Sequence, residues 1–191
     1  MMKTVLSILA VGTAMIAAPA MAQTVTGTVN ITGSVAPKCI VATDASNMFT
    51  VAGATVALGE LADTDGRLKP TGTIATTFGS VSAKVVCTSA APEVSVKADP
   101  IATAAPASTG YDNSIDYLAS VKFTRVGGDT TVTNDSSTGV ASTATLASRL
   151  ANSGDNILVT ASAFQTNAPT DLLVASPSYA GKITVVVGPG I

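Results

Sequence analysis

The sequence predicts an all-β protein, folded as an antiparallel β-sandwich, and three observations support this prediction. Ala, Thr, Val, Ser and Gly dominate the chain, whereas only 12% of its residues are charged, which leaves few of the strong helix formers. The β-branched side chains of Thr and Val are stiff and suit a pleated sheet better than a helix. Many short apolar stretches are separated by turn residues, without the intervening helical patterns of a parallel sheet.

The first 22 residues have the pattern of a secretory signal peptide. Lys3 is followed by an apolar run over 6–18, and Ala20-Met21-Ala22 provides a cleavage site before Gln23. The alternative is a membrane anchor, but the run is shorter than the roughly 20 residues that a spanning helix needs. We therefore expect an exported mature chain that begins at Gln23.

The mature chain has the length of one domain and a weak, mixed charge. Loss of Lys3 leaves nine of the ten basic residues against twelve acidic ones, a net charge of −3. The basic residues are not clustered, so the sequence predicts no nucleic-acid site and no binding to an anionic membrane.

Cys39 and Cys87 are the two cysteines, and both lie in the exported part of the chain. An oxidising compartment favours a disulfide between them, which would stabilise the fold by roughly 3–4 kcal/mol in the loop-entropy model. The alternative is a pair of free buried thiols. Two cysteines without any histidine do not complete a zinc site, and we expect no metal and no cofactor.

Residues 23–35 show the clearest periodicity of the chain. Threonine, asparagine and serine occupy one side of this period-2 pattern, which Pro37 ends. The other side holds Val25, Gly27, Val29, Ile31, Gly33 and Val35.

Further strands are expected at irregular intervals. Residues 127–129 favour a hairpin, 100–110 and 134–139 read as loops, and 145–152 stays undecided between helix and strand. In the last strand Tyr179, Gly181, Ile183, Val185 and Val187 share one face. The expected strands are 49–58, one or two within 73–87 (the second at 81–87), 93–98, 117–126, 130–133, 156–164 and 180–187.

No combination of residues points to catalysis. The chain has no histidine to act as a base near neutral pH, and it has no glycine-rich phosphate-binding motif. Asp63-x-Asp65-Gly66 lacks the further ligands of a calcium loop and reads as a solvated turn. We therefore expect a protein that is not an enzyme.

The order of these features resembles the chaperone–usher pilins, and in particular their archaic branch, which includes the spore-coat-U-like proteins. A signal peptide precedes an alternating strand, Cys39 follows it, Cys87 ends a later strand, and Tyr179 to Val187 forms a terminal strand after Tyr-x-Gly. The resemblance implies an immunoglobulin-like sandwich that lacks its last strand. It divides the chain into a signal peptide (1–22), a donor strand (23–36) and a pilin domain (37–191).

The resemblance also implies a function. The chain would be a structural subunit of a bacterial surface pilus or coat, exported through the periplasm with a chaperone and an outer-membrane usher. Val25, Gly27, Val29, Ile31, Gly33 and Val35 would enter the groove of the next subunit, which makes a head-to-tail filament. The acceptor groove and the chaperone contact would involve Tyr179, Ile183, Val185 and Val187.

Two alternatives remain open at this point. Residues 23–35 could be an ordinary first strand that pairs with the C-terminal strand of the same chain. The whole protein could also be a self-complete secreted sandwich that binds carbohydrate or another surface ligand. The tail after Val187 differs from that of the pilins, because it ends in Gly-Pro-Gly-Ile without an aromatic residue.

Overall fold

The computed structural model describes residues 27–42, 48–49 and 53–190. The predicted signal peptide and Val25 lie outside these residues. The chain divides into two units, residues 1–34 and 35–191.

The described part of the first unit, residues 27–34, contains neither helix nor strand. Its apolar side chains lie in solvent, since Val29 is 86% and Ile31 92% exposed. No atom lies near the positions that a Cβ would take at Gly27 or Gly33. The period-2 pattern of this segment is therefore not used for strand pairing within the described residues.

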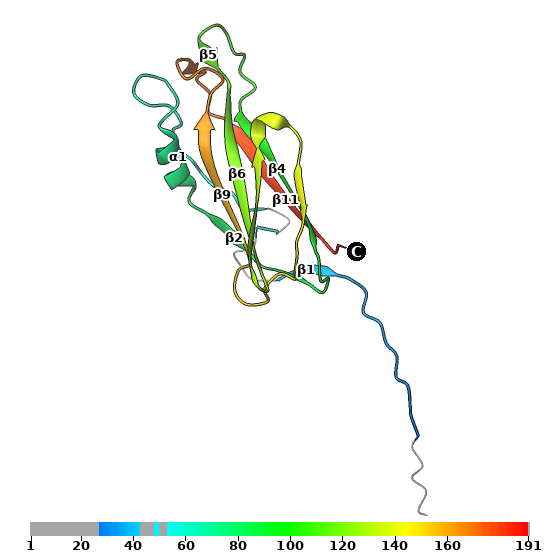
Figure 1. The fold of residues 1–191 in the computed structure, drawn as a ribbon. Helices are drawn as coiled ribbons and strands as arrows, with labels where there is room; N and C mark the ends of the chain where they lie inside the picture. Colours follow the sequence, from blue (N-terminus) through cyan, green and yellow to red (C-terminus); the bar gives the residue numbers. More distant parts are fainter. Residues whose placement is uncertain (1–26, 43–47, 50–52, 191) are drawn as a thin grey trace, which may run out of the picture. The chain divides into compact units, whose positions relative to one another are not determined.

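The second unit is an antiparallel β-sandwich with two layers (Figure 1). One layer has the order β8–β4–β11 and the other β7–β6–β9–β2, and a short contact between the ends of β4 and β6 joins them. Two short pairs flank the layers: β1 with β3, antiparallel, and β5 with β10, parallel. The elements are β1 (Cys39–Val41), α1 (Thr71–Phe78), β2 (Val81–Ala83), β3 (Val85–Cys87), β4 (Glu93–Ala102), β5 (Tyr111–Asp112), β6 (Ser114–Arg125), β7 (Gly128–Asp135), η1 (Ser136–Thr138), β8 (Ser142–Thr145), β9 (Ile157–Gln165), β10 (Leu172–Leu173) and β11 (Ala180–Gly188).

The core lies between the layers and follows the alternation of the strands. In β6, Tyr117, Val121 and Phe123 are buried whereas Leu118 on the opposite face is only half-buried, as the sequence predicts. The predicted hairpin is confirmed, because β6 and β7 pair from Arg125 opposite Gly128. The predicted all-β sandwich is thus confirmed.

Two predictions of secondary structure need correction, and the structure decides one segment that the sequence leaves undecided. A first strand within 73–87 is absent, because Thr71–Phe78 form helix α1, which is followed by Gly79 with a positive φ of 63°. Residues 53–58 form no strand, and the rest of that prediction falls largely outside the described residues. Residues 146–152 form no helix, although Leu146 and Leu150 are both buried.

Helix α1 forms because two of its threonines are satisfied within the helix and its apolar residue Ile74 is buried. The hydroxyls of Thr76 and Thr77 donate to the carbonyls four residues earlier. Ile74 packs into the core beneath the helix. Tertiary burial of this side chain outweighs the preference of threonine for strands. No helix in the described part of the chain has the length and apolarity to cross a membrane.

Candidate functional site

The last strand, β11, is paired on one side only. It runs antiparallel to β4 with Ile183, Val185 and Val187 opposite Ala98, Val96 and Val94. No other described strand pairs with β11, so its second edge has no partner there. An edge strand with unpaired backbone groups is a template for another strand.

An apolar groove runs along this side of β11. Its volume is about 1250 Å³. Part of β11 forms one wall, and residues 53–62 form the opposite wall. The floor consists of side chains from both layers and from α1, namely Phe78, Val81, Ile101, Tyr117, Val159, Ala161 and Phe164.

The wall opposite β11 is also unpaired. Residues 53–59 form no strand and make no backbone hydrogen bond within the described part of the chain. Leu58 packs partly against the core, whereas most of its neighbours are exposed. Both walls of the groove therefore carry backbone N–H and C=O groups that an inserted segment could satisfy.

Tyr117 holds the floor of the groove to β11. Its hydroxyl oxygen lies 3.0 Å from the Asp99 carbonyl oxygen and 3.1 Å from that of Lys182. Its ring stacks on Phe164 with 5.6 Å between the ring centroids. Burial, with a smaller effect of the Asp99 carboxylate, raises the pKa of Tyr117 to about 12. The phenol is therefore neutral at physiological pH and acts as a hydrogen-bond donor.

Asp99 and Tyr179 also have shifted pKa values. The hydrogen bond from Lys97, 2.7 Å from Asp99, is the main cause that lowers the pKa of the Asp99 carboxyl. Burial, followed by the charge of Asp112, raises the pKa of Tyr179. The Tyr179 hydroxyl donates to the Val174 carbonyl at 2.9 Å, which fixes the start of β11.

The disulfide between Cys39 and Cys87 is present and joins β1 to β3. Beside it, Thr88 N donates to the Lys38 carbonyl oxygen at 2.8 Å, and Lys38 N donates to the Thr88 hydroxyl at 2.9 Å. The next residue, Ser89, donates to the Gly190 carbonyl at 3.0 Å. These bonds place residues 36–38 beside the C-terminal end of β11.

Not all of the predicted acceptor residues lie at the groove. Tyr179, Ile183 and Val185 line the groove. Val187 does not, and its side chain packs partly against the core. The ladder with β4 continues to Gly188, one residue further than expected.

The wall at residues 53–62 was not predicted as part of the site. Its sequence suggests an ordinary strand, and only the position of this segment opposite β11 reveals its place in the groove. The predicted donor residues Val29, Ile31 and Val35 are all more than four-fifths exposed, with Val35 at 84%.

The polar residues considered for chemistry make structural contacts. One carboxylate oxygen of Asp63 accepts from the backbone N–H groups of Asp65 and Arg67, which is a closed turn. The described residues contain no group of three His, Cys, Asp or Glu that could hold a metal ion.

Comparisons with known proteins find no relative for this chain. No protein-family model matches the sequence, and neither the curated proteins nor the solved structures yield a match.

Proposed function

We propose that this protein is a structural subunit of a bacterial surface pilus or coat, polymerised by donor-strand exchange. The N-terminal segment of one copy fills the groove beside β11 of the next copy. The observation that carries this proposal is the groove itself, which is apolar and bordered on both sides by unpaired backbone. Export through the periplasm, with a chaperone and an usher as partners, completes the proposal.

The N-terminal segment has the chemistry that such a groove requires. In an extended segment Val29, Ile31 and Val35 point to the same side, and the threonines point to the other. Burying these three exposed side chains would contribute roughly 5–9 kcal/mol in transfer terms, before the cost of ordering the segment. Its backbone can add a ladder of hydrogen bonds with β11 and with residues 53–59.

The size of the groove favours a peptide over a small ligand. Small-molecule sites usually occupy about 300–1,000 Å³ and are largely enclosed. The groove here is larger, at about 1250 Å³, and follows a strand edge. This comparison argues against the self-complete sandwich with a carbohydrate site.

The test uses paired substitutions on the two partners in the mature chain. Val29→Asp places a charge on the side that enters the groove, and Thr28→Asp is its control on the opposite side. Ile183→Asp places a charge in the groove wall, and Val186→Asp is its control, because Val186 is an exposed residue of the same strand that does not line the groove. After purification, oligomers are detected as bands that resist dissociation in denaturing electrophoresis, and fibres are detected by electron microscopy.

We expect that Val29→Asp and Ile183→Asp each prevent fibres, whereas both controls assemble. A mixture of the two defective chains should form dimers, because one retains its groove and the other its donor segment. Fibres formed by a chain that lacks residues 23–35 would refute the proposal.

A further inference from the structure

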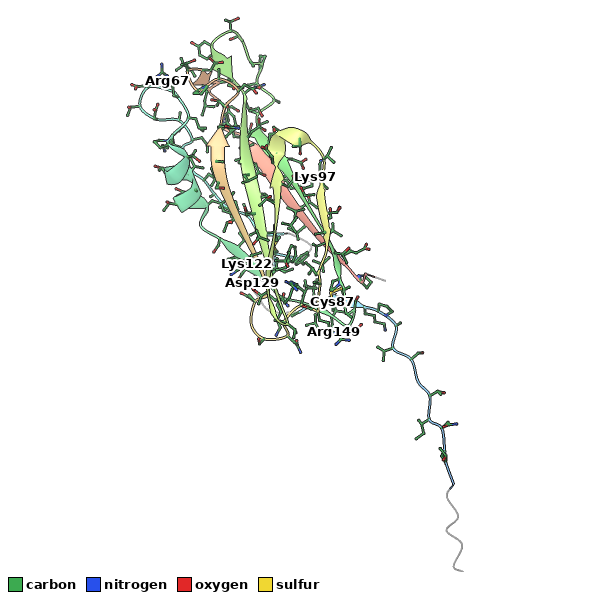
Figure 2. The ribbon with its side chains drawn as sticks, viewed as in Figure 1. Arg67, Cys87, Lys97, Lys122, Asp129 and Arg149 are labelled. Atoms are coloured by element: carbon green, nitrogen blue, oxygen red, sulfur yellow. A yellow bond between two sulfur atoms is a disulfide. The ribbon has the colours of Figure 1, made fainter. Side chains whose placement is uncertain are left out.

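Charged residues are distributed unequally between the two ends of the sandwich. One end is formed by β5, β10 and the turn at residues 63–67, which are joined by the hydrogen bond from Leu173 N to the Gly66 carbonyl oxygen. Arg67 lies at this end in Figure 2. With Arg67 and Lys69 against five acids, its net charge is 2 − 5 = −3. The acids of this end are Glu60, Asp63, Asp65, Asp112 and Asp171.

The opposite end is basic. It comprises the β1–β3 pair, the β6–β7 turn and the loop at 147–156, and Figure 2 shows Cys87, Lys122, Asp129 and Arg149 there. Arg149 connects these parts, since its carbonyl accepts from Val126 N and its Nε donates to Thr88 O. Among the described residues of this end, five bases against Glu93, Asp129 and Asp155 give 5 − 3 = +2. The bases are Lys38, Lys84, Lys122, Arg125 and Arg149.

The groove and the anchor of the N-terminal segment connect these two ends. The groove reaches the acidic end at Gly66, Leu173 and Tyr179. The C-terminal end of β11 and the anchored Lys38 both lie at the basic end. The segment thus joins its own domain at the basic end.

We infer that the basic end of one copy docks on the acidic end of the next copy, and that this contact accelerates and orients assembly. The inference rests on the proposed function. When the N-terminal segment enters the neighbour's groove with Val35 at the Tyr179 end, the basic end of the donor copy lies against the acidic end of the neighbour. The reverse orientation would place two basic ends against each other, which is unfavourable.

The two ends must lie close enough for their charges to interact. Only residues 36 and 37 separate Val35 from the anchored Lys38, and three extended residue steps span about 10 Å. This distance is comparable with the screening length of about 10 Å at 0.1 M salt. Steering by such ends accelerates association and weakens as salt increases.

The experiment follows the assembly rate of the full mature chain by light scattering between 20 and 300 mM NaCl, where the screening length falls from roughly 20 Å to roughly 6 Å. Lys38→Glu changes the basic end from +2 to 0, and Asp65→Lys changes the acidic end from −3 to −1. Neither side chain makes a described hydrogen bond or ion pair. Glu93→Gln raises the basic end to +3. The control is Thr133→Lys, on the exposed face of β7.

We expect the unmodified chain to assemble about tenfold faster at low salt than at high salt. Lys38→Glu and Asp65→Lys should remove most of this difference, Glu93→Gln should enlarge it, and Thr133→Lys should retain it. Acceleration by Glu93→Gln cannot come from damage to the fold.

Two failures can be told apart. Assembly that requires residues 23–35 but is insensitive to salt and to all these substitutions would overturn the charged contact and leave the proposed function intact. Assembly that does not require residues 23–35, or no assembly at all, would overturn both.

Discussion

Replacing Tyr117 with phenylalanine should weaken the fold and remove part of its sensitivity to alkaline pH. The hydroxyl lies within 3.1 Å of backbone carbonyls of both β4 and β11, at the point where the register of their ladder shifts. A buried hydrogen bond of this kind contributes about 1 kcal/mol, and an unpaired carbonyl adds to the loss. We therefore expect Tyr117→Phe to lower the free energy of unfolding by roughly 1–2 kcal/mol at pH 8.

The pH effect follows from the raised pKa. The unfolded chain loses the Tyr117 proton near pH 10, whereas the folded chain retains it until about pH 12. The folded state therefore binds more protons between these values, and its stability falls as the pH rises through this window. Two pK units correspond to at most roughly 2–3 kcal/mol, fully present below pH 10 and lost above pH 12.

Urea unfolding at pH 8 and pH 11 measures both effects. Lysines also titrate in this range, so the informative quantity is the difference between the unmodified chain and Tyr117→Phe. This difference should shrink at the higher pH. An equal fall in stability for both proteins between pH 8 and pH 11 would refute the role given to the hydroxyl.

Three further variants test the fold of the sandwich. Asn156→Leu should lower the free energy of unfolding in urea by at least about 3 kcal/mol, because three backbone groups would lose the buried amide as their hydrogen-bond partner. A loss below about 1 kcal/mol would contradict this reasoning. Replacing Cys39 and Cys87 with serine should cost about 4 kcal/mol by the loop-entropy model, and equal urea midpoints for reduced and oxidised protein would argue against it. Gly181→Ala should cost about 1–3 kcal/mol in thermal unfolding, because its Cβ would lie 2.7 Å from Ile101 Cγ1; an unchanged melting temperature would show that Ile101 moves aside.

Much of the sandwich was predictable because its strands are buried on one face. Alternation in 93–98, 117–123 and 180–187 reflects the burial of every second side chain, and these segments are strands in the structure. The sequence also indicated the hairpin after Arg125 and the pairing of Cys39 with Cys87.

The local sequence pattern predicted the wrong secondary structure where tertiary contacts outweigh local preference. The threonine-rich stretch at 71–78 is helical because burial of Ile74 and hydroxyl bonds within the helix compensate its strand preference. Residues 53–58 have the side-chain pattern of a strand, but no described strand pairs with them. They form no strand because a strand also requires backbone hydrogen bonds to a neighbour.

The sequence by itself determined the fold class and the disulfide, because the fold class depends on composition and local alternation, and the disulfide depends on the presence of two cysteines. Only the tertiary structure decided that an apolar groove stays open between β11 and residues 53–62, and that the charges separate to its two ends. The physical reason is that a groove arises from the absence of a neighbouring strand. Whether a strand has a neighbour depends on how distant segments pack, and no pattern along the chain records it.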